Sequence, residues 1–253
     1  MEASALASGS SGNCFYVSNG DNSVLVDAGI SCRQIELRMA KIGRNIEDID
    51  AVFVTHEHGD HISGVDVLAR KYKLPIYATK GTINQKLCKR KELIKPIKND
   101  ESIKIGKMEI QAFPKSHDAS DPVGFSLFNH KRVSVITDIG YCCQNVKDFV
   151  SDSDMLFLES NHNLGMLEDG PYPIYLKRRI KGEKGHLSNK DSALCVLEHG
   201  GSELKEVILS HLSKNNNGPK KALNSFGILK ERKDLNPKIT ISGRADPTRL
   251  AKI

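Results

Sequence analysis

The chain has 253 residues, of which 39% are hydrophobic and 27% are charged, a balance typical of a folded globular protein and not of a disordered one. Its formal net charge of +6 is modest, so the distribution of the basic residues is more informative than their sum. No apolar stretch is long enough to span a bilayer and the first residues lack the pattern of a signal peptide. We therefore expect a cytoplasmic protein with no membrane partner.

Six cysteines occur in the chain, without Cys-x-x-Cys pairs and at too low a density for a disulfide scaffold. In a reducing compartment such residues stay as thiols, so six free cysteines are predicted. A thiol close to a metal site is the alternative for Cys142 and Cys143.

The N-terminal part of the chain is predicted to be mostly β-structure. Residues 3–7 indicate a strand, and the small residues at 8–13 indicate a loop. Two short apolar segments on either side of residues 19–22 indicate a β-hairpin that ends at Asp27. A helix is expected over 31–42, because apolar residues recur there at helical spacing and a glycine follows.

The most informative stretch follows an apolar run at 49–53. It contains four side chains that can bind metal ions: His56, His58, Asp60 and His61. In an extended segment residues i and i+2 point to the same side, so the first two histidines can bind one ion, and the pair on the next helical turn faces a second ion. Imidazole and carboxylate ligands suit zinc, manganese or iron better than calcium or magnesium. The sequence therefore predicts a two-metal site.

A helix over 62–72 and a short buried strand over 74–78 are expected next, which is the alternation of layered α/β proteins. The segment 80–99 then carries seven basic residues against one acid, Glu92. Such a run is usually the solvated face of a helix, and a contact with a polyanion is the alternative.

Short strands and a further helix are predicted in the rest of the chain. The helix is expected from Ser188 through Leu197. Strands or hairpins are expected over 102–113, 123–136, 155–158, 206–209 and 239–242. Many short strands, several helices and no visible domain boundary fit one α/β domain over 1–253, a four-layer αββα sandwich in which two mixed sheets pack face to face.

The spacing His-x-His-x-Asp-His directly after an apolar strand resembles the signature of the metallo-β-lactamase superfamily. The resemblance implies that one ion is held by His56, His58 and His117. It implies that the other is held by Asp60, His61 and His211, and that the two oxygens of Asp138 bridge both ions. A water between the ions would ionise near neutral pH and act as the nucleophile. Asp27 would support the ligands from behind, with a simple turn role as the alternative.

Seven segments narrow the resemblance: LASGSSGNC at 6–14, SHDA at 116–119, DPVGF at 121–125, ESNH at 159–162, GPYP at 170–173, LKRRI at 176–180 and GHLSN at 185–189. Together they resemble the YycJ (WalJ) family, whose members are regarded as DNA-directed exonucleases of the metallo-β-lactamase fold. The resemblance covers nearly the whole chain. It implies a 5′-to-3′ exonuclease that acts on DNA more than on RNA. The interval between Asp138 and His211 is too short for the cap domain of β-CASP nucleases, so no such insertion is expected.

Three residues are candidates for the group that protonates the leaving oxygen or stabilises negative charge in the transition state: Glu159, His162 and His186. His186 is the first choice, because it precedes a helix and the strand that leads to His211, as in the tRNA 3′-processing enzymes. His162 is the second choice. Asp60 is counted as catalytic as well as a ligand.

Six residues are expected to contact the substrate: Ser11, Asn13, Asn161, Lys177, Arg178 and Arg179. The three basic ones directly precede His186 and suit a phosphate backbone.

Hydrolysis of a small phosphodiester or a thioester by the same metals is the main alternative function. A non-catalytic DNA-binding or regulatory protein is the second alternative.

Overall fold

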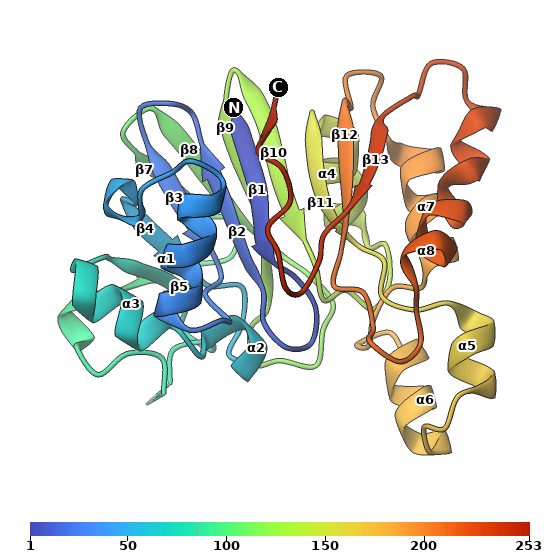
Figure 1. Ribbon diagram of the computed structural model, residues 1–253, viewed down its shortest axis with the longest axis horizontal. Helices are drawn as coiled ribbons and strands as arrows, with labels where there is room; N and C mark the ends of the chain where they lie inside the picture. Colours follow the sequence, from blue (N-terminus) through green and yellow to red (C-terminus); the bar gives the residue numbers. More distant parts are fainter. Residues whose placement is uncertain (85) are drawn as a thin grey trace.

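Two seven-stranded β-sheets form the centre of the computed structural model, which describes residues 1–84 and 86–253 (Figure 1). The strands of the first sheet are β1 (Glu2–Ala7), β2 (Cys14–Ser18), β3 (Ser23–Val26), β4 (Ala51–Phe53), β5 (Ile76–Thr79), β6 (Ile94–Ile97) and β14 (Ala251–Lys252). Those of the second are β7 (Ser102–Ile105), β8 (Met108–Pro114), β9 (Val123–Asn129), β10 (Lys131–Ile136), β11 (Met155–Glu159), β12 (Glu206–Ser210) and β13 (Lys238–Ile241).

Both sheets are mixed. The first has the order β14-β1-β2-β3-β4-β5-β6, and its strands from β3 to β6 are parallel. The second has the order β13-β12-β11-β10-β9-β8-β7, and its strands from β10 to β13 are parallel. The carboxyl ends of parallel strands share one edge of a sheet, so loops that are distant in sequence meet there.

Helices cover both outer faces, which gives the expected four layers (Figure 1). On the first sheet lie α1 (Cys32–Lys41) and α3 (Val65–Tyr72), and on the second lie α4 (Gln144–Asp152), α7 (Asn189–His199), α8 (Pro219–Ser225) and the 3₁₀ helix η3 (Phe226–Glu231). The shorter elements are η1 (Ile46–Asp48), α2 (Gly59–Ile62), η2 (Lys91–Leu93), α5 (Leu164–Asp169) and α6 (Ile174–Lys181). The predicted αββα architecture is therefore confirmed.

Aromatic side chains fill the space between the sheets. Phe15 of β2 lies 5.0 Å from Phe157 of β11, and Phe53 of β4 lies 5.4 Å from Phe125 of β9, measured between ring centroids. Because side chains alternate along a strand, Tyr16 points to the opposite face and packs in the layer that contains α1. The strands beneath the site are thus buried on both faces and form a rigid base for the loops.

Two predictions of helices were wrong. The single helix predicted over 62–72 is divided into α2 and α3 at Gly64, where a Cβ atom would lie 2.0 Å from the carbonyl oxygen of Ile30. The basic segment 80–99 contains no α-helix in its described part, but forms the short 3₁₀ helix η2 and then β6, which pairs with β5. The structure of this segment is determined by its pairing with a neighbouring strand, and the spacing of apolar residues within the segment does not indicate that pairing. Four helices, α4, α5, α6 and α8, were not predicted.

The cysteine prediction was wrong for one pair. Cys142 and Cys195 form a disulfide with their Cα atoms 6.2 Å apart, whereas Cys14, Cys32, Cys88 and Cys143 are free. The two partners are 53 positions apart in sequence, and only the packing of α7 beside the loop after β10 brings them together.

No helix in residues 1–84 and 86–253 combines the length and apolar character that crossing a bilayer requires.

Candidate metal centre

Loops from both sheets bring histidines and carboxylates together at one edge of the sandwich. The residues that meet there are His56, His58, Asp60, His61, His117, Asp138, Glu159, His186 and His211. They lie at the end of β11, in the loops after β4, β8, β10 and β12, in α2, and in the segment before α7. All seven proposed metal ligands are within this set.

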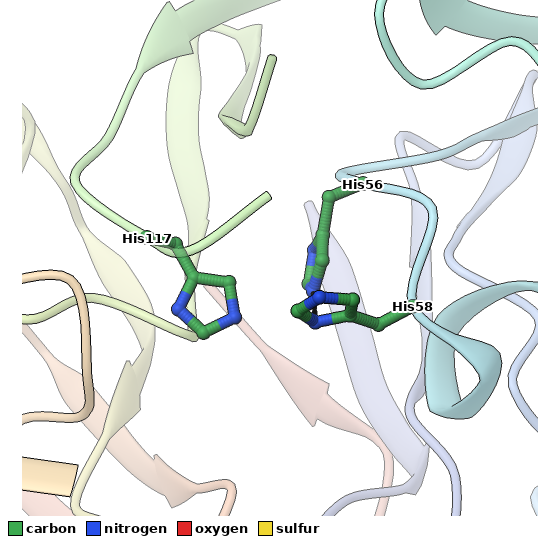
Figure 2. A group of neighbouring side chains, drawn as sticks. All are labelled: His56, His58 and His117. Carbon is green, nitrogen blue, oxygen red and sulfur yellow. Dashed lines mark hydrogen bonds between the residues drawn. The ribbon is translucent and has the colours of Figure 1, made fainter. Parts of the chain in front are cut away.

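The first group consists of His56, His58 and His117. One ligand atom from each lies within 4.8 Å of the others, and Figure 2 shows the three imidazoles facing one another. His56 Nε2 and His58 Nδ1 are 3.1 Å apart. His117 reaches them from the second sheet, so the group spans the two sheets and forms only when they pack.

The second group consists of Asp60, His61 and His211, within the same 4.8 Å limit. Asp138 lies between the groups: its Oδ2 is 3.2 Å from His61 Nε2 and its Oδ1 is 4.0 Å from His117 Nε2. Asp138 is therefore close to histidines of both groups, and its bridging role stays a prediction.

Each buried imidazole is held through one nitrogen by a group behind it. His61 Nδ1 donates to Asp27 Oδ2 at 2.7 Å, and His211 Nδ1 donates to Glu159 Oε1 at 2.9 Å. In the first group, His117 Nδ1 donates to the Gly185 carbonyl oxygen at 3.2 Å. The contact with Asp27 is the supporting one implied by the resemblance. Such bonds fix the ring and leave the other nitrogen free for a metal.

Unpartnered atoms test whether this centre suits a cation. Asp138 Oδ2 and His211 Nε2 are buried and have no hydrogen-bond partner among residues 1–84 and 86–253. A buried polar atom without a partner costs about 1–3 kcal/mol. Imidazole nitrogens with carboxylate oxygens are the ligand chemistry of zinc and related divalent ions, so the residues fit a metal centre.

The protonation equilibria favour the same conclusion. Burial lowers the pKa of His56 well below its usual range and that of His117 to about 4, so both rings are neutral and able to bind metal. Burial also opposes the protonation of His61, but the carboxylates of Asp27 and Asp138 outweigh it and raise its pKa to about 10. The carboxylates therefore supply negative charge that a divalent cation would offset.

Three residues of the centre have left-handed backbone conformations. The φ angles are 60° at Asp27, 55° at Asp138 and 55° at His211; Asp27 and His211 directly follow strands, and Asp138 lies two residues after the end of β10. Such conformations cost about 1–3 kcal/mol for residues other than glycine and persist where the surroundings impose them. They turn the three side chains into the centre.

Glu159 connects the second group to His186. Its Oε1 accepts from His186 Nδ1 at 2.9 Å, and its Oε2 accepts from the backbone N–H groups of Ile139 and Leu187 at 2.8 and 3.0 Å. Burial would raise the pKa of Glu159, but its contacts with His186 and His211 outweigh this effect and lower the pKa to about 2. The carboxylate is thus ionised and fixes both imidazoles. The His186 side chain is 18% exposed, so a substrate can reach it.

His162, the second candidate for the acid, is not in these groups. Its side chain is buried, neither ring nitrogen has a hydrogen-bond partner, and burial lowers its pKa to about 4. Its backbone pairs with that of Ser188.

The six predicted substrate contacts divide into two sets. Asn13 and Asn161 are buried beside the ligands: Asn13 Nδ2 is 3.2 Å from His61 Nε2, and Asn161 Nδ2 donates to the His211 carbonyl oxygen at 2.9 Å. Ser11 and Arg178 are exposed. The other two contact this chain, because Lys177 Nζ donates to the Glu168 carbonyl oxygen at 2.6 Å and Arg179 forms an ion pair with Asp118 at 2.6 Å.

An asparagine network supports the loop that carries His211, and the sequence did not reveal it. Asn217 Nδ2 lies 2.8 Å from the carbonyl oxygens of Ser160 and Asn161. The amides of Asn217 and Asn189 also exchange two hydrogen bonds of 2.9 Å. The run of three asparagines at 215–217, shortly after His211, is the only signal in the sequence that could have indicated it.

Asn217→Ala is expected to lower the free energy of unfolding by about 1–3 kcal/mol, because it removes the amide that donates to the buried Ser160 carbonyl oxygen and its two hydrogen bonds with Asn189. Metal affinity should fall about tenfold, since the support of the His211 loop is lost. Urea denaturation and metal titration measure the two effects. Asn99→Ala is the control, because Asn99 is exposed and contacts only the Asp121 side chain. Unchanged stability and metal affinity in Asn217→Ala would contradict a supporting role.

Residues 22–212 match the family model described as the beta-lactamase superfamily domain. The chain is 39% identical over 226 residues to the exodeoxyribonuclease YycJ of Bacillus anthracis, a match that covers 86% of this chain and 84% of the relative. It is 40% identical over 222 residues to the exodeoxyribonuclease WalJ of Streptococcus pneumoniae, covering 85% and 82%. The chain belongs to the YycJ/WalJ family of the beta-lactamase superfamily. The resemblance seen in the sequence is thereby confirmed.

Solved structures agree on the fold of this YycJ/WalJ family member. The metallo-β-lactamase-fold protein YhfI of Bacillus subtilis has a TM-score of 0.73 at 16% identity, with 98% of each chain covered. The short form of human tRNase Z has a TM-score of 0.67 at 13% identity and complete coverage of both chains. At such identities the likeness concerns the fold alone.

Proposed function

We propose that this protein is a divalent-metal-dependent exodeoxyribonuclease that degrades DNA from the 5′ end. The observation that carries the proposal is the assembly of two histidine and carboxylate groups around Asp138, in a chain that is 39–40% identical to exodeoxyribonucleases over most of its length. Because the ligands come from both sheets, residues 1–253 act as one hydrolase domain. Only α4, β11, α5, α6, α7 and β12 lie between Asp138 and His211, and no β-CASP cap is among them.

The two groups of ligands suit two divalent metal ions. Zinc or manganese is our first choice for these ions, and iron is the alternative. His56, His58 and His117 would hold the first, and Asp60, His61 and His211 the second, with Asp138 contacting both. Divalent cations supply Lewis acidity, which activates water and offsets the charge that develops on the phosphate during hydrolysis.

His186 is the residue that we assign to protonate the leaving oxygen. Its Nδ1 is fixed by Glu159, which leaves Nε2 as the nitrogen that can face the substrate. The 18% exposure of its side chain distinguishes it from His162, which is 1% exposed and therefore remains the second choice. Protonation by a positioned imidazole is an ordinary contribution to phosphodiester cleavage.

Ser11 and the exposed Arg178 are assigned to the DNA backbone, together with Lys177 and Arg179 once a phosphate replaces their present partners. The buried Asn13 and Asn161 orient His61 and the His211 loop, and thereby affect substrate only indirectly. Basic groups next to a metal centre are what a phosphodiester polymer requires.

The test is a panel of single- and double-stranded DNA and RNA, labelled at either end and incubated with zinc, manganese or iron. Stepwise release of nucleotides from the 5′ end of DNA is the expected result. His117→Ala should abolish it, because His117 is the contribution of the second sheet to the first group. Cleavage of a small diester or a thioester alone, under all metals, would contradict the proposal.

A further inference from the structure

The segment 171–184 is an arm that stands outside the layered core. None of its residues is buried, and α6 in particular has no buried side chain. In Figure 1, α5 and α6 project below the second sheet, at the same end of the molecule as α2. A helix of this length is not stable alone in water, so its contacts with the rest of the chain keep it in place.

The base of the arm is joined to the metal centre. Arg179 forms its ion pair with Asp118, the residue after His117. The backbone N–H of His186 donates to the carbonyl oxygen of Ile180 at 2.9 Å. Because His117 and His186 belong to the centre, a molecule bound along the arm lies directly next to the reacting groups.

The two sides of α6 differ in character. Lys177 and Lys181 face α5, where Lys181 forms an ion pair with Glu168 at 2.9 Å. Farther around the helix lie Arg178 and Tyr175, which are neighbours because they are three positions apart; Ile174, four positions before Arg178, lies between Arg178 and the two lysines. Ile174 is 68% exposed and Tyr175 is 74% exposed. In the part of the chain that the structure describes, Arg178 forms no ion pair.

We propose that this exposed face of α6, formed by Ile174, Tyr175 and Arg178, is the docking surface for the single-stranded end of a DNA substrate. The inference rests on the proposed nuclease function. Unpaired bases stack on an exposed aromatic ring without regard to sequence. An arginine that forms no ion pair attracts the phosphate group between two successive bases. Paired bases inside a duplex are stacked on both faces, and only the terminal pairs keep a free one, so a duplex offers Tyr175 far fewer contacts than an unpaired strand. The arm therefore selects single-stranded ends and leads them to the centre.

A fluorescence experiment tests the contact directly. The chain contains no tryptophan, so Tyr175→Trp carries a single indole at the proposed contact. Stacking with a single-stranded oligonucleotide should quench its emission, and a blunt duplex of the same sequence, which offers only the faces of its terminal pairs, should quench it much less. Phe128→Trp is the matched control, because Phe128 is 40% exposed and lies near the end of β9, away from the arm. Equal quenching of both variants, or none in Tyr175→Trp, would overturn the proposal.

Kinetics separate this inference from the function on which it rests. Tyr175→Ala should raise KM for single-stranded DNA about tenfold, and Tyr175→Phe should keep the wild-type value, because stacking needs only the ring. Both variants should hydrolyse bis(p-nitrophenyl) phosphate at the wild-type rate, since this small diester does not reach the arm. If the wild-type protein degrades DNA and Tyr175→Ala does so equally well, the arm proposal fails alone. If the wild-type protein degrades no DNA, the proposed function fails.

A second copy of the chain is the competing occupant of the exposed face. Sedimentation of the wild-type protein and of Ile174→Ser decides between them. A monomer in both cases is expected. A wild-type dimer that dissociates in Ile174→Ser would show that the face is a contact between subunits, and would overturn the DNA proposal.

Discussion

Asp138→Asn is expected to lower the rate of DNA hydrolysis by about three orders of magnitude, because several kcal/mol of charge stabilisation depend on both ions being held in place. Asp138 lies within 4.0 Å of four imidazoles, those of His61, His117, His186 and His211. Burial opposes its ionised form, but the charges of His211 and His61 hold its pKa well below the usual range. A neutral amide at this position can offer only one oxygen as a ligand.

Asparagine is the better replacement because Asp138 has a φ of 55°. Asparagine tolerates the left-handed conformation, whereas alanine is strained in it. The Asp138→Asn variant should therefore fold, which circular dichroism checks, while metal analysis should show less metal per chain than in the wild type. Asp234→Asn is the control, since Asp234 is exposed and pairs only with Arg232. A folded Asp138→Asn protein with wild-type turnover would exclude the bridging role.

The fold and the clustering of the candidate ligands were largely predictable, because local patterns in the sequence indicate both. Period-two burial identifies strands such as β8, and the cap residue Ser188 correctly predicts the start of α7. His56 and His58 are two positions apart in sequence and meet because residues i and i+2 of an extended segment point to the same side. The same reasoning placed His211 at the end of a strand, where the structure has it.

Other features depend on contacts between distant segments, which a sequence does not display. The left-handed conformation of His211 follows from its surroundings, as does the approach of Cys142 to Cys195. The role of Glu159 as a support for two imidazoles requires three elements to meet. The arm was missed for a different reason: Gly165, Gly170, Pro171 and Pro173, before it and at its start, indicate a linker, and α6 lacks the buried stripe by which periodicity detects a helix.

His186→Ala is expected to lower the rate of DNA hydrolysis by about 10²–10⁴-fold, the usual contribution of a positioned acid. Its metal content should stay at the wild-type level, because Asp60, His61 and His211 form the second group without it. Metal analysis together with nucleotide release measures both. Since His186 also lies 3.7 Å from Asp138 Oδ1, metal lost along with activity would show that it is a ligand instead.

A comparison of two substrates with different leaving groups identifies the role of His186 in the reaction. The oxygen of a deoxyribose leaves as a strongly basic alkoxide and needs a proton, whereas p-nitrophenolate is stable without one. His186→Ala should therefore hydrolyse bis(p-nitrophenyl) phosphate at nearly the wild-type rate while failing on DNA. Equal losses on both substrates would assign His186 to charge stabilisation in the transition state. His162→Ala is the matched comparison: the buried, neutral His162 should contribute little, and a substrate-selective loss in that variant would transfer the role of the acid to it.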